Sequence, residues 1–141
     1  TKDVLTVRPQ TTVREVAELL VSHKISGLPV VDDVGKLVGI ISEGDLMSKE
    51  ILPEPPAELC ILGAVIYYSG LKEYQEAFAR MAANTAEQLM TKTVVTAKAY
   101  DDVSDVARLM RDRHIKRVPV LDDEGHLIGI VSRQDIVKML L

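Results

Sequence analysis

The sequence predicts a mixed α/β (α+β) protein made of two similar halves, each with the order strand, helix, strand, strand, helix. Residues 4–46 recur at residues 94–136 with a constant offset of 90, and 17 of the 43 aligned positions are identical. In both copies a stretch with helical spacing of its apolar residues is followed by two short β-rich runs. Because the halves share one pattern, a site predicted in the first should be sought in the second as well.

Each copy opens with a short β-type run and continues into a helix. In the first copy the run covers residues 4–7, and Thr12 with Glu15 has the spacing of a helix-capping box. In the second copy Asp102 and Asp105 occupy the same two positions. The apolar residues that follow have the spacing of one helix face: Val13, Val16, Ala17 and Leu20 in the first copy, and Val103, Val106, Ala107 and Met110 in the second.

The middle of each copy predicts a β-hairpin, because two apolar runs flank a turn that begins Asp-Asp and ends in Gly. The paired runs are residues 28–31 with 37–41, and residues 118–121 with 127–131. Few polar residues interrupt these runs, so we expect strands that are buried on both faces and covered by helices. A last helix begins near Ser42 in the first copy and near Ser132 in the second.

Residues 51–90 belong to neither copy, which divides the chain into a first motif (1–50), a partly helical insert (51–90) and a second motif (91–141). Three prolines at the start of the insert indicate a break or linker: Pro53, Pro55 and Pro56. Residues 60–68 form an apolar run that fits either a strand or a buried helix.

The second part of the insert predicts a helix that ends near Asn84, followed by a capped turn at Thr85 and Gln88. One stripe of this helix is apolar: Leu71, Tyr74, Phe78 and Met81. We expect the insert to cover the sheets or to form a dimer contact, and the alternative is a surface for another protein.

The composition is that of a soluble globular protein, with 47% hydrophobic and 27% charged residues. The net charge of −4 argues against a general affinity for nucleic acid or anionic membranes. A single cysteine excludes a disulfide framework within the chain. No apolar stretch reaches the roughly 20 residues of a membrane span, and no signal peptide is evident. We therefore expect a cytoplasmic protein.

The most informative local pattern is Ser-x-x-Asp directly after a strand, at Ser42 with Asp45 and again at Ser132 with Asp135. One interpretation is structural, since this spacing forms a capping box. The other is functional: a helix N-terminus attracts phosphate, and an aspartate there can accept hydrogen bonds from sugar hydroxyls. The duplication favours the functional interpretation, although a cap would also be copied.

Together with the segment Pro-Val-h-Asp-Asp-x-Gly-x-Leu-h-Gly-Ile-h before each Ser-x-x-Asp (h is apolar), these residues resemble the cystathionine-β-synthase (CBS) domain. Two in tandem resemble a Bateman module. The resemblance covers roughly 90 residues and implies two motifs packed by pseudo-two-fold symmetry. It also implies clefts that bind an adenine nucleotide (AMP, ADP or ATP) or a related adenosyl ligand.

The resemblance also implies which residues contact the ligand. Asp45 and Asp135 would hold ribose hydroxyls, and Ser42 and Ser132 would hold phosphate or ribose. Backbone groups and apolar contacts would frame the adenine at these residues: Thr6, Ile25, Ser26, Gly27, Leu28 and Pro29 in the first motif, and Thr96, Ile115, Lys116, Arg117, Val118 and Pro119 in the second.

The two sites are not expected to be equal. The second motif carries Lys116 and Arg117 where the first has Ser26 and Gly27, and it carries Arg133 at the position of Glu43. Cations at these positions match family positions that reach phosphates, so we expect the first motif to hold a less charged ligand or none. Because the clefts lie between motifs, Arg117 can instead serve a ligand held by Ser42 and Asp45. The alternative for each of these cations is that it lies on the solvated surface and contacts no ligand.

No catalytic or metal-binding residue is predicted. His23, His114 and His126 have neither metal-ligand spacing nor a nucleophile nearby, and no phosphate-binding Gly-x-x-x-x-Gly-Lys loop is present. We therefore predict a regulatory ligand sensor that is not an enzyme, forms a homodimer and signals to an unknown protein partner by a conformational shift. The alternatives are an interaction module with vestigial clefts, or a regulatory fragment of a larger enzyme or transporter.

Overall fold

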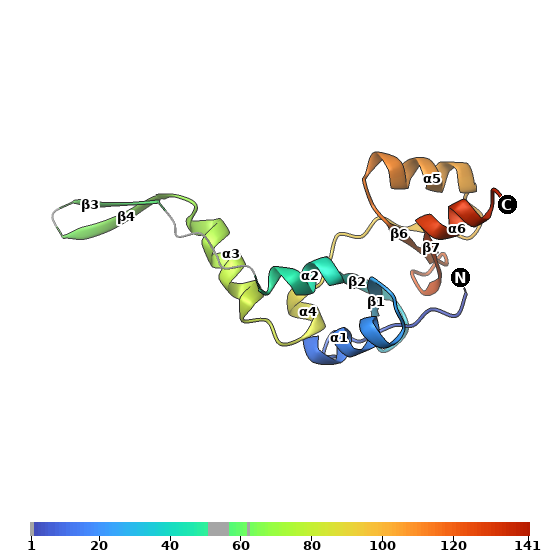
Figure 1. Cartoon of the computed structure of the whole chain (residues 1–141), viewed down its shortest axis with the longest axis horizontal. Helices are drawn as coiled ribbons and strands as arrows, with labels where there is room; N and C mark the ends of the chain where they lie inside the picture. The colour runs from blue at the N-terminus through green and yellow to red at the C-terminus, as the bar shows by residue number, and fades with distance from the viewer. Residues whose placement is uncertain (1, 51–56, 62) are drawn as a thin grey trace.

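The computed structural model describes residues 2–50, 57–61 and 63–141 and consists of two α/β motifs and a projecting arm (Figure 1). The helices are α1 (Val13–Ser22), α2 (Glu43–Ser48), α3 (Leu71–Met81), α4 (Ala86–Leu89), α5 (Val103–Asp112) and α6 (Arg133–Lys138). The strands are β1 (Gly27–Val31), β2 (Leu37–Ser42), β3 (Ala57–Ile61), β4 (Ala64–Ser69), β5 (Ala97–Lys98), β6 (Arg117–Leu121) and β7 (Leu127–Ser132). The predicted mixed α/β class and the predicted hairpins are confirmed.

In the first motif the sheet is the antiparallel pair β1–β2, extended by one bridge to the N-terminal segment. The N–H of Val7 donates to the Pro29 carbonyl (3.1 Å), and the N–H of Val31 donates to the Val7 carbonyl (2.9 Å). The predicted run at residues 4–7 therefore pairs only at Val7. Val4 and Leu5 leave the sheet and line the cleft described below.

The second motif repeats this arrangement with the same register. Arg117 lies opposite Ser132 as Gly27 lies opposite Ser42, and β5 pairs in parallel with β6. The expected burial of the strands holds best for β1, in which every residue after Gly27 is buried. In β2 and β7 burial is only partial, so the expectation of strands buried on both faces does not hold for them.

The hairpin turns are fixed by an aspartate that binds the backbone. Oδ1 of Asp32 accepts hydrogen bonds from the N–H groups of Val34 (3.0 Å) and Lys36 (2.9 Å), and the Lys36 bond is the main reason that the pKa of Asp32 is lowered. Gly35 closes the turn with a φ of 85°, which lies in the left-handed region. Asp122 has the same role in the second motif.

These two turns meet each other, which joins the motifs around a pseudo-two-fold axis. The N–H of Leu37 donates to the Gly125 carbonyl (3.3 Å), and the N–H of Leu127 donates to the Gly35 carbonyl (3.1 Å). The donors of the two bonds are 90 positions apart in the sequence, and so are the acceptors. The two bonds are therefore equivalent, as the sequence repeat predicts for two motifs related by a two-fold axis.

The predicted helix caps are confirmed with one correction. Thr12 and Glu15 form the capping box of α1, and Ser42 and Ser132 begin α2 and α6. At α5, Asp102 caps the helix through the N–H of Ser104 (3.0 Å) without forming a box. The side chain of Asp105 instead accepts a bond from Arg108 (3.1 Å).

The end of the insert contributes to the core of the first motif. In α4 and just before it, Ala83, Ala86 and Leu89 are buried and pack in one cluster with Val16 and Ile41. The N–H of Ala86 also donates to the Thr11 carbonyl (2.8 Å). The second motif has a smaller cluster of buried residues: Ala97, Val106, Met110 and Val118.

The rest of the insert forms the arm, which we define as β3, β4 and α3. The run at residues 60–68 fits either element from sequence; its residues 60–61 lie in β3 and its residues 64–68 lie in β4, which pairs with β3 antiparallel. The predicted amphipathic helix is confirmed as α3, and Gln88 accepts bonds from the N–H groups of Asn84 (2.8 Å) and Thr85 (3.3 Å). The linker predicted from Pro53, Pro55 and Pro56 lies outside the described residues.

A substitution at Gly39 tests how closely β2 packs against the residues that follow α4. A Cβ at Gly39 would lie 2.5 Å from Sδ of Met90 and 3.0 Å from the backbone oxygen of Thr91. We expect Gly39→Ala to lower the free energy of unfolding by about 1–3 kcal/mol in a urea titration. Gly44→Ala is the matched control: its Cβ would meet only Oγ of Ser42 at 3.6 Å, so we expect a gain of about 0.5–1 kcal/mol. Equal effects of the two substitutions would contradict this packing.

Candidate functional site

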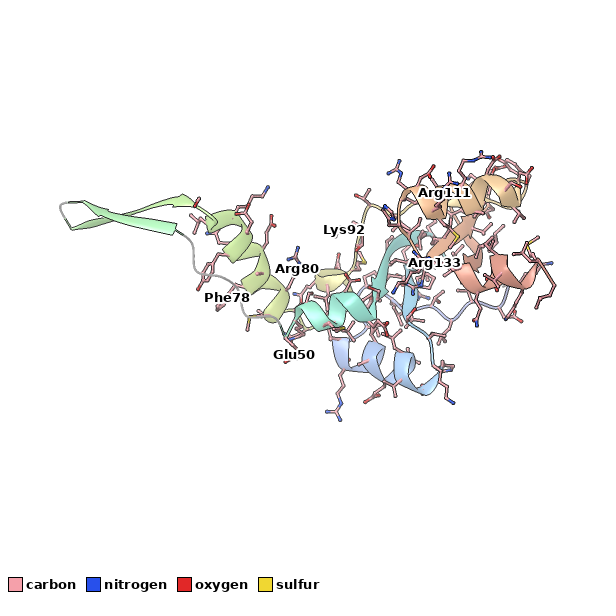
Figure 2. All side chains as sticks on the ribbon, turned by 45° about the horizontal axis from the view of Figure 1, so that its top comes forward. Glu50, Phe78, Arg80, Lys92, Arg111 and Arg133 are labelled. Carbon is pink, nitrogen blue, oxygen red and sulfur yellow. The ribbon has the colours of Figure 1, made fainter. Side chains whose placement is uncertain are left out.

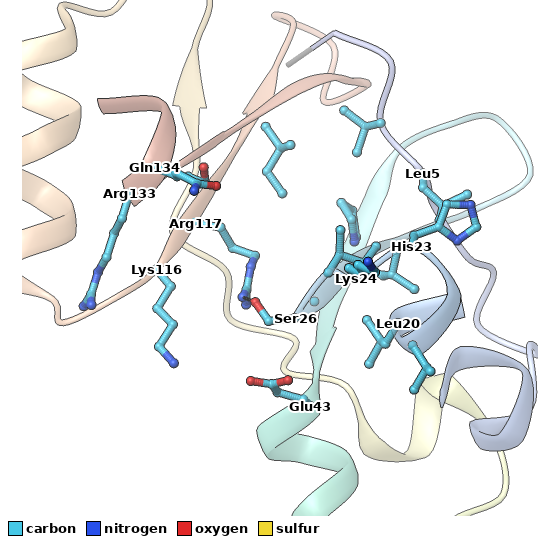
Figure 3. Close-up of a pocket in the computed structure, with 18 of the residues that line it drawn as sticks. Leu5, Leu20, His23, Lys24, Ser26, Glu43, Lys116, Arg117, Arg133 and Gln134 are labelled. Atoms are coloured by element: carbon cyan, nitrogen blue, oxygen red, sulfur yellow. Dashed lines mark hydrogen bonds between the residues drawn. The ribbon is translucent and has the colours of Figure 1, made fainter. Parts of the chain in front are cut away.

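A cleft of about 1000 Å³ lies between the two motifs and takes its walls from both of them. The first motif contributes the N-terminal segment, the end of α1, the start of β1 and residues of α2. The second motif contributes the start of β6 and the junction of β7 with α6. Figure 3 shows that polar groups from the two motifs face one another across it.

The local structure of the α1–β1 connection turns the chain toward the cleft. Lys24 has a φ of 53°, and the N–H of Ile25 donates to the Leu20 carbonyl (3.1 Å), which is the pattern of a Schellman helix end. His114 and Ile115 repeat this geometry before β6. The same turn therefore presents residues 25–27 in one motif and residues 115–117 in the other.

The cleft brings together ten of the residues that were predicted to contact a ligand: Ile25, Ser26, Gly27, Leu28, Pro29, Lys116, Arg117, Ser132, Arg133 and Asp135. In the first motif they lie at the start of β1 and just before it. In the second motif they lie at the start of β6 and at the junction of β7 with α6. One cleft thus combines an adenine-framing segment of the first motif with the Ser-x-x-Asp segment of the second.

The other predicted residues do not line this cleft: Thr6, Ser42, Asp45, Thr96, Ile115, Val118 and Pro119. Thr6 lines a separate depression beside α1. Val118 and Pro119 are fully buried residues of β6, and Ile115 packs against the second core cluster.

The side chain of Arg117 links the two motifs in the cleft. Its guanidinium reaches from the second motif to the first, where it donates a hydrogen bond to Oγ of Ser26 (Figure 3). A Cβ at Gly27 would lie 2.6 Å from Nη1 of Arg117, so the missing side chain leaves the space that the guanidinium occupies. The mismatched pairs Ser26-Gly27 and Lys116-Arg117 are therefore complementary in space.

The environment of Arg117 is only partly solvated. Burial lowers the pKa of its guanidinium, and the nearby carboxylates of Glu43 and Asp45 act in the opposite direction. Since an arginine stays charged at physiological pH, a partly desolvated cation stands at the wall of the cleft. Lys116 and Arg133 add two further cations on the same side, and Nε of Arg133 donates to the Ile115 carbonyl (3.3 Å).

The two Ser-x-x-Asp segments form the capping boxes that their spacing predicts. The N–H of Ser42 donates to Oδ2 of Asp45, and the N–H of Ser132 donates to Oδ2 of Asp135, each at 2.9 Å. The Ser132 bond is the main cause of the lowered pKa of Asp135, so this carboxylate is ionised at neutral pH. In the described part of the chain these bonds use Oδ2, which leaves Oδ1 of Asp135 available to a ligand that enters the cleft.

Several cleft residues were not among the predicted contacts: Asp3, Val4, Leu5, Leu20, Lys24, Glu43 and Gln134. Leu20 has the spacing of the buried face of α1, which indicated core packing rather than a cleft wall. Among the described residues, no group of histidine, cysteine, aspartate or glutamate side chains could hold a metal ion. None of the described helices has the length and hydropathy of a membrane crossing.

Comparison with known families and proteins gives one consistent result. The CBS domain family model matches residues 1–51 and 86–141. Protein MJ1426 of Methanocaldococcus jannaschii is 38% identical over 138 residues, which cover 90% of this chain and 80% of that protein. The chloroplastic CBS domain-containing protein CBSX2 of Arabidopsis thaliana is 31% identical, and this chain spans 58% of its length.

Solved structures with the same fold contain adenosyl compounds. The crystal structure of CBSX2 in complex with AMP has a TM-score of 0.77 at 29% identity and covers 99% of this chain and 89% of that chain. The CBS domain pair of protein MJ0100, in complex with 5-methylthioadenosine and S-adenosyl-L-methionine, has a TM-score of 0.71 at 30% identity. The match covers 100% of this chain and 94% of that chain.

Proposed function

Because this chain belongs to the CBS domain family, we propose that it is a regulatory module that binds an adenine nucleotide in the cleft between its two CBS motifs. It carries out no chemistry of its own. The observation that carries the proposal is the cleft of about 1000 Å³, which combines apolar walls with cations from the opposite motif. Small-molecule sites have this character: apolar surface supplies affinity, and a few polar groups fix orientation.

The charges of the cleft favour a phosphate-bearing ligand. Lys116, Arg117 and Arg133 lie on one side of it, and charge-assisted hydrogen bonds to phosphate are the strong ones. A sulfonium ligand such as S-adenosylmethionine would place a further positive charge in the cleft. We therefore rank AMP, ADP and ATP above adenosyl ligands without phosphate.

In the proposed complex each wall has a separate role. Ile25, Val4 and Leu5 line the cleft and are not buried, so they offer apolar surface to the adenine ring. Asp135 accepts hydrogen bonds from the ribose through Oδ1, as acidic residues do in dinucleotide sites. The Arg117 guanidinium donates to the phosphate and no longer to Oγ of Ser26.

This exchange suggests how binding becomes a signal. The bond from Arg117 to Ser26 joins the two motifs, so a ligand that replaces it changes their relative orientation. The ligand shifts the population of orientations by the difference in its affinity for them. A partner protein, or a second part of a longer chain, reads that orientation.

A second candidate is a regulatory segment of a larger enzyme. The inosine-5'-monophosphate dehydrogenase of Methanocaldococcus jannaschii is 34% identical over 137 residues, and this chain spans only 22% of its length. In this case the same cleft binds the nucleotide, and a catalytic domain of the same protein responds to the change in orientation of the motifs.

Thermal denaturation with a ligand panel tests the proposal. The panel is AMP, ADP, ATP, NAD, S-adenosylmethionine and adenosine. At one hundred times its Kd, a ligand should add roughly 2.7 kcal/mol to the free energy of unfolding. We expect stabilisation by the phosphorylated adenosines at concentrations where adenosine has little effect. If no member of the panel raises the Tm, the sensor proposal fails and an interaction module with vestigial clefts is favoured.

The sequence repeat supplies a matched pair of variants for the role of Asp135. Asp135→Ala and Asp45→Ala remove equivalent caps, so we expect each to lower the free energy of unfolding by about 0.5–2 kcal/mol. Because only Asp135 lines the cleft, we expect AMP affinity to fall in Asp135→Ala alone. Calorimetric titration of both variants measures this difference. Equal AMP affinities would show that Asp135 acts as a cap only.

A further inference from the structure

Glu43 places a negative charge in the cleft where the second motif has a positive one. The N–H of Glu43 donates to the Ser26 carbonyl (2.9 Å), and the N–H of Arg133 donates to the Lys116 carbonyl (3.0 Å). Each donor is the first residue of its helix, α2 or α6, and both residues line the cleft. Arg133 lies on the side of the second motif that faces the first (Figure 2). Equivalent backbone positions therefore supply the cleft with opposite charges.

The charge of Glu43 acts on the cations that the proposed function assigns to the phosphate. Figure 3 shows that Lys116 and Arg117 extend toward the side of the cleft on which Glu43 lies. Burial lowers the pKa of Arg117, and of the two carboxylates that raise it Glu43 has a larger effect than Asp45. Only Glu43 of these two lines the cleft. A phosphate bound by Arg117 therefore comes close to the Glu43 carboxylate.

The position of the Glu43 side chain is not explained by a structural bond. The side chain is exposed, and no described residue forms an ion pair or a hydrogen bond with it. Its structural contribution is that of any carboxylate in the first turn of a helix, where the helix dipole favours negative charge. Glu87 has the same place in the first turn of α4 and does not line the cleft.

A count of charges indicates which ligands Glu43 disfavours. AMP carries a charge of about −2 at neutral pH, and each further phosphate group of ADP or ATP adds roughly −1. Lys116, Arg117 and Arg133 supply three positive charges to this side of the cleft, and Glu43 offsets one of them. The remaining positive charge balances AMP, whereas the longer phosphate chain of ATP brings uncompensated negative charge next to a carboxylate.

We propose that Glu43 is a specificity-determining residue that favours ligands with one phosphate group over ligands with a longer phosphate chain. This role rests on the proposed function, because it requires that the cleft binds an adenine nucleotide through Arg117. A repulsive group of this kind gives specificity by weakening the binding of the competing ligand. Because Glu43 is exposed, water screens the repulsion, so Glu43 changes the ratio of two affinities and does not abolish binding.

Isothermal titration calorimetry with AMP and with ATP, both without Mg²⁺, tests this role. We expect Glu43→Gln to shift the ratio of the two Kd values toward ATP by about three- to tenfold. Glu43→Arg copies the residue of the second motif and should shift the ratio further in the same direction. Both shifts should shrink at about 0.5 M NaCl, because salt screens the charge.

Glu87→Gln is the matched control, since it removes a first-turn carboxylate outside the cleft and leaves the same net charge as Glu43→Gln. We expect its ratio of Kd values to equal that of the wild type. If the wild type binds AMP and neither substitution of Glu43 shifts the ratio toward ATP, the role of Glu43 is overturned while the nucleotide site stands. An equal shift in Glu87→Gln would also overturn it. If the wild type binds neither nucleotide, the proposed function fails and this role fails with it.

Discussion

Arg117→Ala is expected to weaken AMP binding by roughly 10- to 150-fold, which corresponds to about 1.5–3 kcal/mol for hydrogen bonds to a charged group. The guanidinium is partly buried between the motifs, where its attraction to phosphate is less screened than at an exposed site. Isothermal titration calorimetry of the variant and the wild type measures the ratio of the two Kd values.

Two further substitutions make this result specific to Arg117. Arg108→Ala removes an exposed arginine of α5 that pairs with Asp105 outside the cleft, and we expect its AMP affinity to equal that of the wild type. Arg117→Lys keeps the charge without the planar pair of donors, so its affinity should lie between the other two. If Arg117→Ala and Arg108→Ala bind AMP equally well, the phosphate does not contact Arg117.

Leu89→Ala is expected to lower the free energy of unfolding by about 2–5 kcal/mol. Leu89 is only 6% exposed and packs with Val16 and Ile41 in the core of the first motif, although it lies outside the repeat. The loss arises from the cavity that the smaller side chain leaves. Urea denaturation followed by circular dichroism measures it.

Glu87→Ala provides the control from the same helix. Glu87 is exposed, and an exposed substitution of this kind changes stability by only about 0.5 kcal/mol. A loss below about 1 kcal/mol in Leu89→Ala would mean that α4 is peripheral to the first motif.

The fold could be predicted largely from the sequence because its signals are local and duplicated. The Asp-Asp-x-Gly turns and the helix caps each depend on residues only a few positions apart. The packing of Leu89 was not predictable in this way. Its buried contacts join segments that are far apart in the chain.

The cleft could be predicted only in part, for a similar reason. The repeat indicated that Ser26-Gly27 and Lys116-Arg117 differ, but not that they face each other. That contact depends on how the motifs meet at Gly35 and Gly125, which is a property of the assembled pair. In this chain the signal was the alignment of Gly27 in one copy with Arg117 in the other.

A crystal structure of the chain grown with AMP would show directly whether the cleft between the motifs is the nucleotide site. We expect one AMP in that cleft, with its phosphate bound by Arg117, its ribose at Asp135 and the bond from Arg117 to Ser26 broken. A cleft that stays empty at saturating AMP, or a nucleotide bound while Arg117 still donates to Ser26, would show that the proposed function is wrong.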